Sequence, residues 1–279
     1  MPTLFSIGHG YSARALTPLL LERGWEVIGT TRTREKAETL AAESVTPLIW
    51  PGADLAPHIA NATHILTSVA PGEGDPVLAE YADALRAAPA QWVGYLSTVG
   101  VYGDRQGGWV DETSELLATT KRGRARIQAE AEWAALGLPV HIFRLAGIYG
   151  PGRGPFSKVR AGTARRIIKE GQVFSRIHVE DIAATLLASI DRPRPGAIYN
   201  VCDNDPAPPQ DVIAYAATLL GLPVPPGIPY AEAEFTPMQR SFYAESKKCS
   251  NRLLREELGV ELDYPDYKTG LDDLLKRAG

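Results

Sequence analysis

The feature that most constrains this chain is a glycine turn near its start, placed between a strand and a helix. Residues 3–7 form a short apolar run with β-branched and aromatic members, which predicts a strand. Residues 8–13, Gly-His-Gly-Tyr-Ser-Ala, follow at once and fit G-x-G-x-x-A. Helical apolar spacing then continues to Gly24, and a second apolar run covers residues 25–29. This order predicts a dinucleotide-binding unit.

Each small residue of the turn has a physical role in holding a pyrophosphate. Gly8 permits the tight turn out of the strand, Gly10 lets phosphates approach the backbone, and Ala13 lets the helix lie close to the strand. The helix start, at Tyr11 and Ser12, offers backbone N–H groups and the positive end of its dipole. An ordinary turn between strand and helix is the alternative interpretation.

The end of the second strand distinguishes between cofactors. An acidic residue there would bind the ribose hydroxyls of NAD. This chain instead has hydroxyl and guanidinium groups, among them Thr31 and Arg32. Such groups suit the 2′-phosphate of NADP, with which arginine makes a charge-assisted pair. The sequence therefore favours NADP over NAD, and a solvated helix start is the alternative.

Composition narrows the class of protein. The chain has 279 residues, of which 44% are hydrophobic and 22% charged, as in ordinary globular proteins. Its net charge of −4 argues against a general nucleic-acid surface. Cys202 and Cys249 show neither a disulfide framework nor metal-ligand spacing, so we expect a reducing compartment and no metal. With no leader or membrane-length apolar run, we expect a cytoplasmic protein without membrane or nucleic-acid partners.

Strands and helices alternate along the first half of the chain, which predicts an α/β fold with a Rossmann-type, doubly wound parallel sheet. Further strands are predicted at residues 45–50, 63–69, 91–97 and 138–145. Helices are predicted between them at residues 34–42, 75–88 and 121–136, with Asp75 as an N-cap. Small residues lie at the carboxyl end of the fourth strand, where such a sheet opens to ligand, namely Ser68, Val69 and Ala70.

After Gly150 the chain becomes richer in proline, glycine and loops. We predict helices at residues 156–163, 179–190, 210–220 and 246–258, and strands at 165–168 and 197–202. The pattern indicates a Rossmann domain over residues 1–150, to which the strand and helix of 176–202 return. A smaller, mixed C-terminal annex on the substrate side is expected within residues 151–279.

Four further stretches of the chain resemble one enzyme family. They read YLSTVGVYGD at residues 95–104, FRLAGIYGPG at 143–152, IHVEDIA at 177–183 and YNV at 199–201. The chain is similar to the extended short-chain dehydrogenases/reductases of the NAD-dependent epimerase/dehydratase type. The resemblance implies an NAD(P)-dependent oxidoreductase, epimerase or dehydratase acting on a small polar or nucleotide-sugar-like substrate. A homodimer is the assembly that the resemblance suggests.

The resemblance also implies roles for single residues. Ser97 or Thr98 would polarise a substrate oxygen, and Ala146 and Gly147 would lie beside the nicotinamide. The family uses a Tyr-x-x-x-Lys pair as acid/base. Counting back from Glu130 places arginines at both of its positions, Arg122 and Arg126.

The chain therefore departs from the family at its defining pair and resembles an atypical branch. Arginine stays protonated at neutral pH and cannot replace a general acid/base. Tyr102, just past Ser97 and Thr98, is the best remaining proton donor, and loop packing is its alternative role. Tyr149 ranks second as a donor.

Several basic and aromatic residues are candidates for contacting the substrate. Arg126, Tyr149 and Arg153 are candidates for binding an anionic substrate group, with a solvated helix face as the alternative for Arg126. His178 and Asp181 are interpreted as structural, His178 buried and Asp181 at a helix start.

The missing acid/base pair keeps a second class of function open. A cofactor-binding protein without turnover, such as an NADP(H) sensor or scaffold, would need the same fold and glycine turn. Hydride exchange with any substrate would separate this alternative from an enzyme.

We predict that Arg32→Ala weakens NADPH binding by about tenfold or more, because a charge-assisted hydrogen bond contributes about 1.5–3 kcal/mol. Titration of NADPH and NADH into the wild type and the variant measures this. Equal binding of both nucleotides, unchanged in the variant, would overturn the role of Arg32. Binding of neither nucleotide would undermine the interpretation of the glycine turn.

Overall fold

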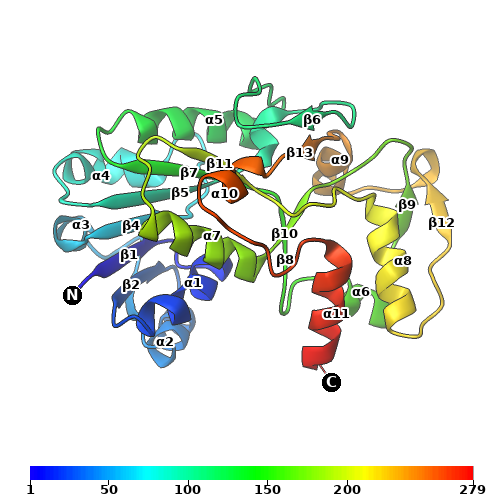
Figure 1. Ribbon diagram of the computed structural model, residues 1–279, viewed down its shortest axis with the longest axis horizontal. Coiled ribbons are helices and arrows are strands. Elements are labelled where there is room, and N and C mark those ends of the chain that lie inside the picture. Colours follow the sequence, from blue (N-terminus) through cyan, green and yellow to red (C-terminus); the bar gives the residue numbers. More distant parts are fainter. Residues whose placement is uncertain (279) are drawn as a thin grey trace.

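A seven-stranded sheet is the largest sheet of the computed structural model, which describes residues 1–278, and it lies in the left half of Figure 1. All neighbouring strands in it are parallel. In spatial order they are β11 (Ile198–Val201), β7 (Val140–Leu145), β5 (Trp92–Thr98), β4 (His64–Thr67), β1 (Thr3–Ile7), β2 (Glu26–Thr31) and β3 (Thr46–Ile49). The order reverses between β1 and β4, which is the switch point of a doubly wound sheet. The predicted Rossmann-type fold is confirmed.

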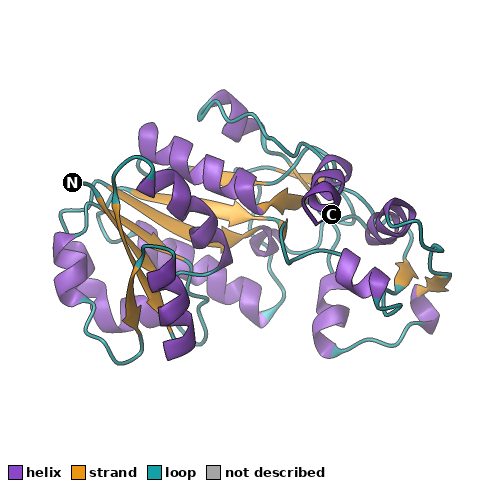
Figure 2. Ribbon diagram, turned by 90° about the horizontal axis from the view of Figure 1, so that it is seen from below, coloured by secondary structure: helices purple, strands orange, loops and turns teal. Residues whose placement is uncertain are grey.

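Helices cover both faces of the sheet (Figure 2). The first apolar core packs one face against α1 (Tyr11–Leu21), α2 (Arg34–Ala42) and α7 (Val179–Asp191). The second core packs the other face against α3 (Ala56–Asn61), α4 (Pro76–Arg86) and α5 (Lys121–Ala134). Because α7 packs beside α1, the segment after residue 176 returns to the half of the molecule that contains the main sheet.

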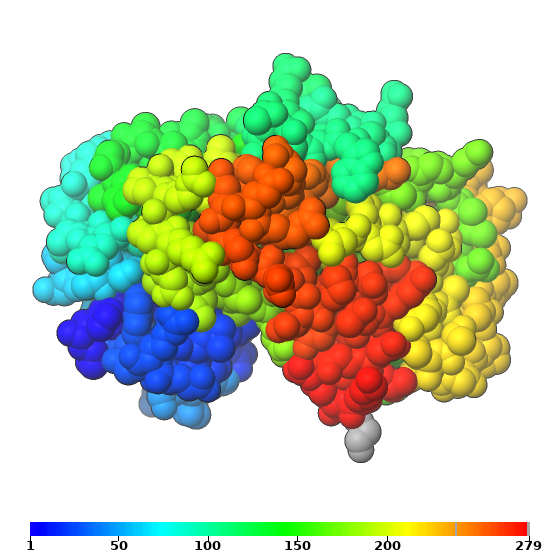
Figure 3. Space-filling model, in the orientation of Figure 1, coloured from blue at the N-terminus to red at the C-terminus, as the bar shows by residue number. Residues whose placement is uncertain are grey.

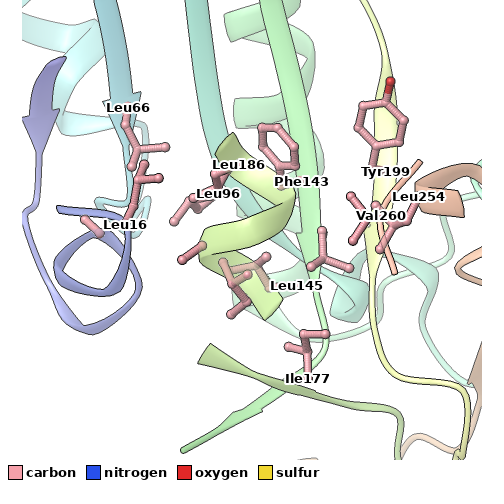
Figure 4. Packing of buried hydrophobic residues seen from close by; sticks show 14 of the residues in the cluster. Leu16, Leu66, Leu96, Phe143, Leu145, Ile177, Leu186, Tyr199, Leu254 and Val260 are labelled. Atoms are coloured by element: carbon pink, nitrogen blue, oxygen red, sulfur yellow. The ribbon is translucent and has the colours of Figure 1, made fainter. Parts of the chain in front are cut away.

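The central strands are buried on both faces, which explains why their sequences read as apolar runs. In β5, Trp92 and Leu96 belong to the first core, whereas Val93 and Tyr95 belong to the second. Figure 4 shows the first core, where Leu186 of α7 lies near Leu96.

The predicted N-cap of α4 is confirmed, and it also anchors a neighbouring helix. One carboxylate oxygen of Asp75 accepts the N–H groups of Val77 and Leu78, at 2.9 and 3.2 Å. Its other oxygen accepts the indole N–H of Trp133 at 2.9 Å. Asp75 therefore fixes both the start of α4 and its packing against α5.

A buried polar network lies beneath the carboxyl ends of β5, β7 and β11. Arg144 forms an ion pair with Glu130 at 2.8 Å, and both side chains are almost fully buried. Glu130 also accepts the hydroxyl of Ser97 at 2.5 Å. Arg144 donates to the hydroxyl of Tyr102 at 2.9 Å, and Tyr102 donates to Asn200 at 2.7 Å. The network thereby joins α5 to three strands of the sheet.

The remaining elements build the annex and its connections to the sheet. Three pairs of short parallel strands lie outside the main sheet: β8 (Gly147–Tyr149) with β10 (Arg176–His178), β9 (Arg166–Ile168) with β12 (Gly227–Pro229), and β6 (Trp109–Val110) with β13 (Lys248–Cys249). The helical segments are η1 (Val99–Tyr102), α6 (Phe156–Arg160), α8 (Pro209–Leu219), η2 (Tyr230–Glu232), α9 (Pro237–Tyr243), α10 (Arg252–Glu256) and α11 (Tyr267–Ala278).

A third apolar core lies among α6, α8 and α11. Tyr149 of β8 belongs to it and packs against Gly270 of α11. A Cβ atom at position 270 would lie 2.2 Å from the Tyr149 hydroxyl, so the helix approaches this ring only because Gly270 has no side chain.

The prediction of one helix over residues 246–258 is wrong in its first part. Residues 248–249 form a strand instead, and α10 covers only 252–256. The cause is pairing with the distant loop after η1, because Asp104 accepts the N–H of Ser246 at 2.8 Å and Lys248 donates its N–H to Gly108 at 2.9 Å. The sequence around residues 246–249 does not indicate that this segment pairs with a distant loop. Helix α11 was not predicted.

Across residues 1–278, no helix combines the length and the apolar character that crossing a bilayer requires.

Removing one partner of the buried ion pair should destabilise the protein more than replacing both partners by apolar residues. We expect Arg144→Met to lower the free energy of unfolding by about 3–5 kcal/mol, because it leaves the Glu130 carboxylate buried without its partner. The double variant Glu130→Leu/Arg144→Met should recover part of that loss. Urea denaturation of the wild type, Arg144→Met, Glu130→Leu and the double variant measures both effects, and a double variant that loses as much as the summed single variants would contradict this account.

Candidate functional site

The glycine turn lies at the switch point, where β1 and β4 end side by side. Gly8 has a φ of +81°, and a Cβ there would lie 2.9 Å from the Val69 side chain and 3.0 Å from the Ser68 hydroxyl. Ser68 donates a hydrogen bond to the Gly8 carbonyl. The Gly8 N–H donates to the Thr30 hydroxyl at 2.7 Å. The fold itself therefore requires glycine at this position.

Gly10 differs from Gly8, because nothing in the fold requires it to be glycine. It is the N-cap of α1, in extended backbone with a φ of −103°. A Cβ there would meet its nearest atom, the Gly8 carbonyl oxygen, at an ordinary 3.7 Å. The first-turn N–H groups, from Tyr11 to Ala13, have no acceptor within the helix. Gly10 therefore leaves open space in front of unused backbone donors.

The residue between the two glycines supports the turn from inside, which the sequence interpretation missed. The His9 ring is buried and shares a hydrogen bond of 3.1 Å with Thr17. A Cβ on Gly29 of β2 would lie only 2.7 Å from that ring. Burial lowers the pKa of His9 to about 4, so the ring is neutral near pH 7. Gly29, a glycine inside an apolar strand, was the sequence feature that could have indicated such close packing.

The residues proposed to select the cofactor follow β2. Thr31 is buried, and its carbonyl accepts the N–H of Trp50 at 2.9 Å. Arg32 is exposed. The side chain that caps α2 belongs to Thr33, which accepts the N–H of Lys36 at 3.4 Å. Arg32 is therefore not used by the helix start.

Ser97 and Thr98 have different surroundings at the end of β5. The Ser97 hydroxyl is buried and donates to Glu130 in the polar network. Thr98 is half-buried, and its hydroxyl oxygen accepts the N–H of Gly100 at 3.1 Å. Of the two alternatives for polarising a substrate oxygen, the geometry favours Thr98.

Tyr102 lies inside the protein rather than on a cleft. Its side chain is fully buried, and its hydroxyl bonds to both Arg144 and Asn200. Burial raises its pKa above the ordinary value of a phenol. The structure therefore favours the packing role for Tyr102 over proton donation to a substrate.

The two arginines at the Tyr-x-x-x-Lys positions have different surroundings. Arg122 is exposed, as a solvated helix face predicts. Arg126 is half-buried and donates to the Leu96 carbonyl at 2.6 Å and to the Tyr95 hydroxyl at 3.1 Å. Arg126 therefore faces the end of β5 and not bulk solvent.

The loop after β8 reaches back to the glycine turn. The Tyr11 hydroxyl donates to the Pro151 carbonyl at 3.0 Å, and the Arg153 guanidinium lies 5.6 Å from the centre of the Tyr11 ring. A Cβ on Gly150 would lie 2.7 Å from the Tyr11 hydroxyl oxygen. Close packing thus brings the proposed cofactor residue Tyr11 and the proposed substrate residue Arg153 together.

Ala146 and Gly147 connect β7 to β8. Ala146 is buried and donates its N–H to Val201 at 3.0 Å. Gly147 is exposed, and its N–H donates to Ser175 at 3.1 Å. They therefore lie beside the carboxyl end of β11, where the main sheet passes into the annex.

Tyr149 and His178 pack together at the same junction. The Tyr149 hydroxyl donates to the Asp266 carbonyl at 3.3 Å, and its ring lies edge-on to His178 with centroids 5.2 Å apart. His178 caps α7, and burial lowers its pKa to about 4. Asp181 accepts the N–H groups of Asp263 and Tyr264, at 2.9 and 3.2 Å. These contacts agree with the structural interpretation of His178 and Asp181.

A partly enclosed cavity of about 160 Å³ lies among β8, β10, α6, α8 and α11. Its lining residues are Ile148, Tyr149, Arg153, Gly154, Pro155, Arg176, Val212, Tyr267 and Leu271. On the molecular surface, a notch separates the blue N-terminal segment from the red α11 (Figure 3).

A buried carboxyl group near this cavity was missed by the sequence interpretation. Asp203 lies two residues past the end of β11 and is 1% exposed. Burial raises its pKa to about 8, although the Arg176 guanidinium opposes this shift. Its position at the carboxyl end of a buried strand was the available signal.

Comparisons with known proteins agree with the fold. No family model matches the chain. A solved structure from Silicibacter pomeroyi, described as a functionally unknown conserved protein, is 56% identical, with a TM-score of 0.95 over 100% of this chain and 99% of that one. Protein YeeZ of Escherichia coli K12 is 29% identical over 93% of this chain and 95% of its own.

More distant solved structures share the fold and contain nicotinamide cofactors. The human epimerase family protein SDR39U1, solved with NADPH, is 20% identical, with a TM-score of 0.76 over 98% of this chain and 99% of its own. MoeE5, solved with UDP-glucuronic acid and NAD, is also 20% identical, with a TM-score of 0.78 over the whole of both chains.

Asp203 should make stability depend on pH. In the unfolded chain its carboxyl ionises near 3.8, whereas in the fold it stays protonated up to about 8. We therefore expect the wild type to lose stability relative to Asp203→Asn as pH rises from about 4 to about 8, by about 1.4 kcal/mol per pH unit.

Urea denaturation at several pH values across that window measures the difference. Asp83→Asn is the control for loss of an aspartate charge, because the Asp83 side chain is 99% exposed. A constant difference for Asp203→Asn would contradict the assignment of a protonated carboxyl.

Proposed function

Since the chain has the fold of the NAD(P)-dependent epimerase/dehydratase proteins and resembles the extended short-chain dehydrogenases/reductases, we propose that it binds NADP(H) at the switch point and catalyses a hydride-transfer reaction. The reaction is an oxidoreduction, epimerisation or dehydration of a small polar or nucleotide-sugar-like substrate. The observation that carries this proposal is the open space at Gly10, in front of the first-turn N–H groups of α1.

The residues around Gly10 fit a dinucleotide. The backbone of Gly10, Tyr11 and Ser12 would hold the pyrophosphate, with Gly8 and Ala13 setting the turn and the helix packing. The wall of the crevice would come from the end of β4, at Ser68, Val69 and Ala70.

NADP is the preferred cofactor in this proposal. Arg32 is exposed at the end of β2 and is not used to cap α2. Its guanidinium is therefore available to a 2′-phosphate, next to the hydroxyl of Thr31. Ala146 and Gly147 would border the nicotinamide.

When bound, the nicotinamide would supply the hydride chemistry. Thr98 would donate a hydrogen bond to the reacting substrate oxygen, because it is the half-buried hydroxyl at the end of β5. Arg126 and Arg153 would bind anionic groups of the substrate, and Tyr149 lines the same cavity as Arg153. Because Tyr102 is enclosed by the polar network, water is the proton carrier that we propose in its place.

A non-catalytic NADP(H)-binding protein is the second candidate. The observation that favours it is the pair of arginines, Arg122 and Arg126, where the family has its acid/base pair. Net hydride transfer from a sugar-nucleotide carbinol carbon to NADP⁺, or from NADPH to a small carbonyl compound, followed by NADPH absorbance, would exclude this candidate, as would conversion of a sugar nucleotide without net change in the cofactor. Tight cofactor binding without either outcome would support it.

The glycine turn offers a direct test of the cofactor site. We expect Gly10→Ala to fold like the wild type and to bind NADPH about tenfold more weakly or worse, because the added methyl group keeps the phosphates from the backbone donors. Titration calorimetry gives the affinity, and circular dichroism with thermal unfolding reports on the fold.

Gly8→Ala is the matched comparison. Its backbone has a positive φ and its Cβ would meet Val69 at 2.9 Å, so this variant should lose stability as well as binding. NADPH affinity that is unchanged in Gly10→Ala would refute the proposed pyrophosphate site.

A further inference from the structure

The cavity among β8, α6, α8 and α11 contains a guanidinium whose hydrogen-bonding capacity is only partly used. Nη1 of Arg176 donates to the carbonyls of Phe174 and Ala207, at 2.9 and 3.0 Å. A guanidinium carries five N–H donors, and these contacts use one of its three nitrogens. The Tyr267 ring lies 6.0 Å from its central carbon. Within residues 1–278, no carboxylate lies within 4.0 Å of Arg176.

The acidic groups nearest to Arg176 do not neutralise it. Asp203 and Asp205 are close enough to act on its charge, but neither forms an ion pair with it. Asp203 holds its proton to about pH 8, because burial raises its pKa. The guanidinium therefore has no carboxylate in contact with it among residues 1–278, and a bound anion would supply one.

The other cavity walls are apolar or aromatic. Ile148, Pro155, Val212 and Leu271 surround it together with the rings of Tyr149 and Tyr267. Its volume, about 160 Å³, is close to that of an apolar protein cavity of about 150 Å³ known to hold benzene. A sugar nucleotide needs a site several times larger. The cavity is therefore suited to one ring or a branched chain of similar size.

The cavity also lies beside the proposed cofactor site. Arg153 lines it, and the same side chain stacks on Tyr11 in the first turn of α1. An anionic ligand in the cavity would thus have a second, exposed cation at its rim, on the side that faces the glycine turn.

Building on the proposed function, on which this step rests, we propose that the cavity binds the substrate through a carboxylate. The substrate is a small monocarboxylate with an apolar body about the size of a benzene ring. Its carboxylate pairs with Arg176, and its body lies between Tyr149, Val212 and Leu271. Arg153 attracts the anion at the rim.

Benzoate is the probe for this proposal, and benzamide is its uncharged match. Ligand-observed NMR titration of the full chain, with and without NADPH, should show benzoate binding about tenfold more tightly than benzamide or better. Arg176→Gln should remove that preference. Arg153→Gln should weaken benzoate binding less, because Arg153 is exposed.

Leu271→Trp is a second variant that leaves Arg176 intact and fills the cavity. It should abolish benzoate binding while NADPH binding persists, which also reports that the variant is folded. Equal binding of benzoate and benzamide, or benzoate binding unchanged in Arg176→Gln or in Leu271→Trp, would overturn the proposal. If the wild type binds benzoate but not NADPH, the carboxylate site stands and the proposed function fails.

Discussion

The ion pair between Arg144 and Glu130 determines how the carboxyl edge of the sheet is built. It is buried between α5 and β7, and its hydrogen bonds extend to Ser97, Tyr102 and Asn200. Two charges away from water are stable only when they are paired and their remaining hydrogen-bonding groups are satisfied, so the five side chains are held as one unit. Since Arg126 lies one turn before Glu130 on α5, the same unit places its guanidinium against the end of β5.

This arrangement leaves the carboxyl edge of the sheet without the proton-transfer groups of a Tyr-Lys pair. The hydroxyls of Ser97 and Tyr102 are committed to the interior, and Thr98 keeps the half-buried position. Guanidinium groups can hold and orient anions, but they do not exchange protons near neutrality. The reaction proposed for this edge would therefore depend on the substrate, the cofactor and water for its proton movements.

The sheet could be predicted from sequence because its strands are buried on both faces and separated by helices of ordinary length. The tight turn at Gly8 was equally readable, since Gly8 follows a strand directly and has a positive φ, although its contacts with Ser68 and Val69 come from a distant strand end. The roles of Ser97 and Tyr102 were not readable, because their partners Glu130 and Asn200 lie 33 and 98 residues further along the chain. The annex was harder still, because strand β13 exists only by pairing with a loop more than a hundred residues earlier.

The hydrogen bond from Tyr11 to Pro151 has a thermodynamic consequence. It ties the helix that would receive the pyrophosphate to the loop that carries Arg153, and Gly150 packs against the same hydroxyl without intervening space. A ligand at the start of α1 and a ligand beside Arg153 would therefore both contact residues that this hydrogen bond joins. If occupancy of one side shifts it, the affinity of the other side changes by the same factor in both directions, because linkage between two binding equilibria is reciprocal.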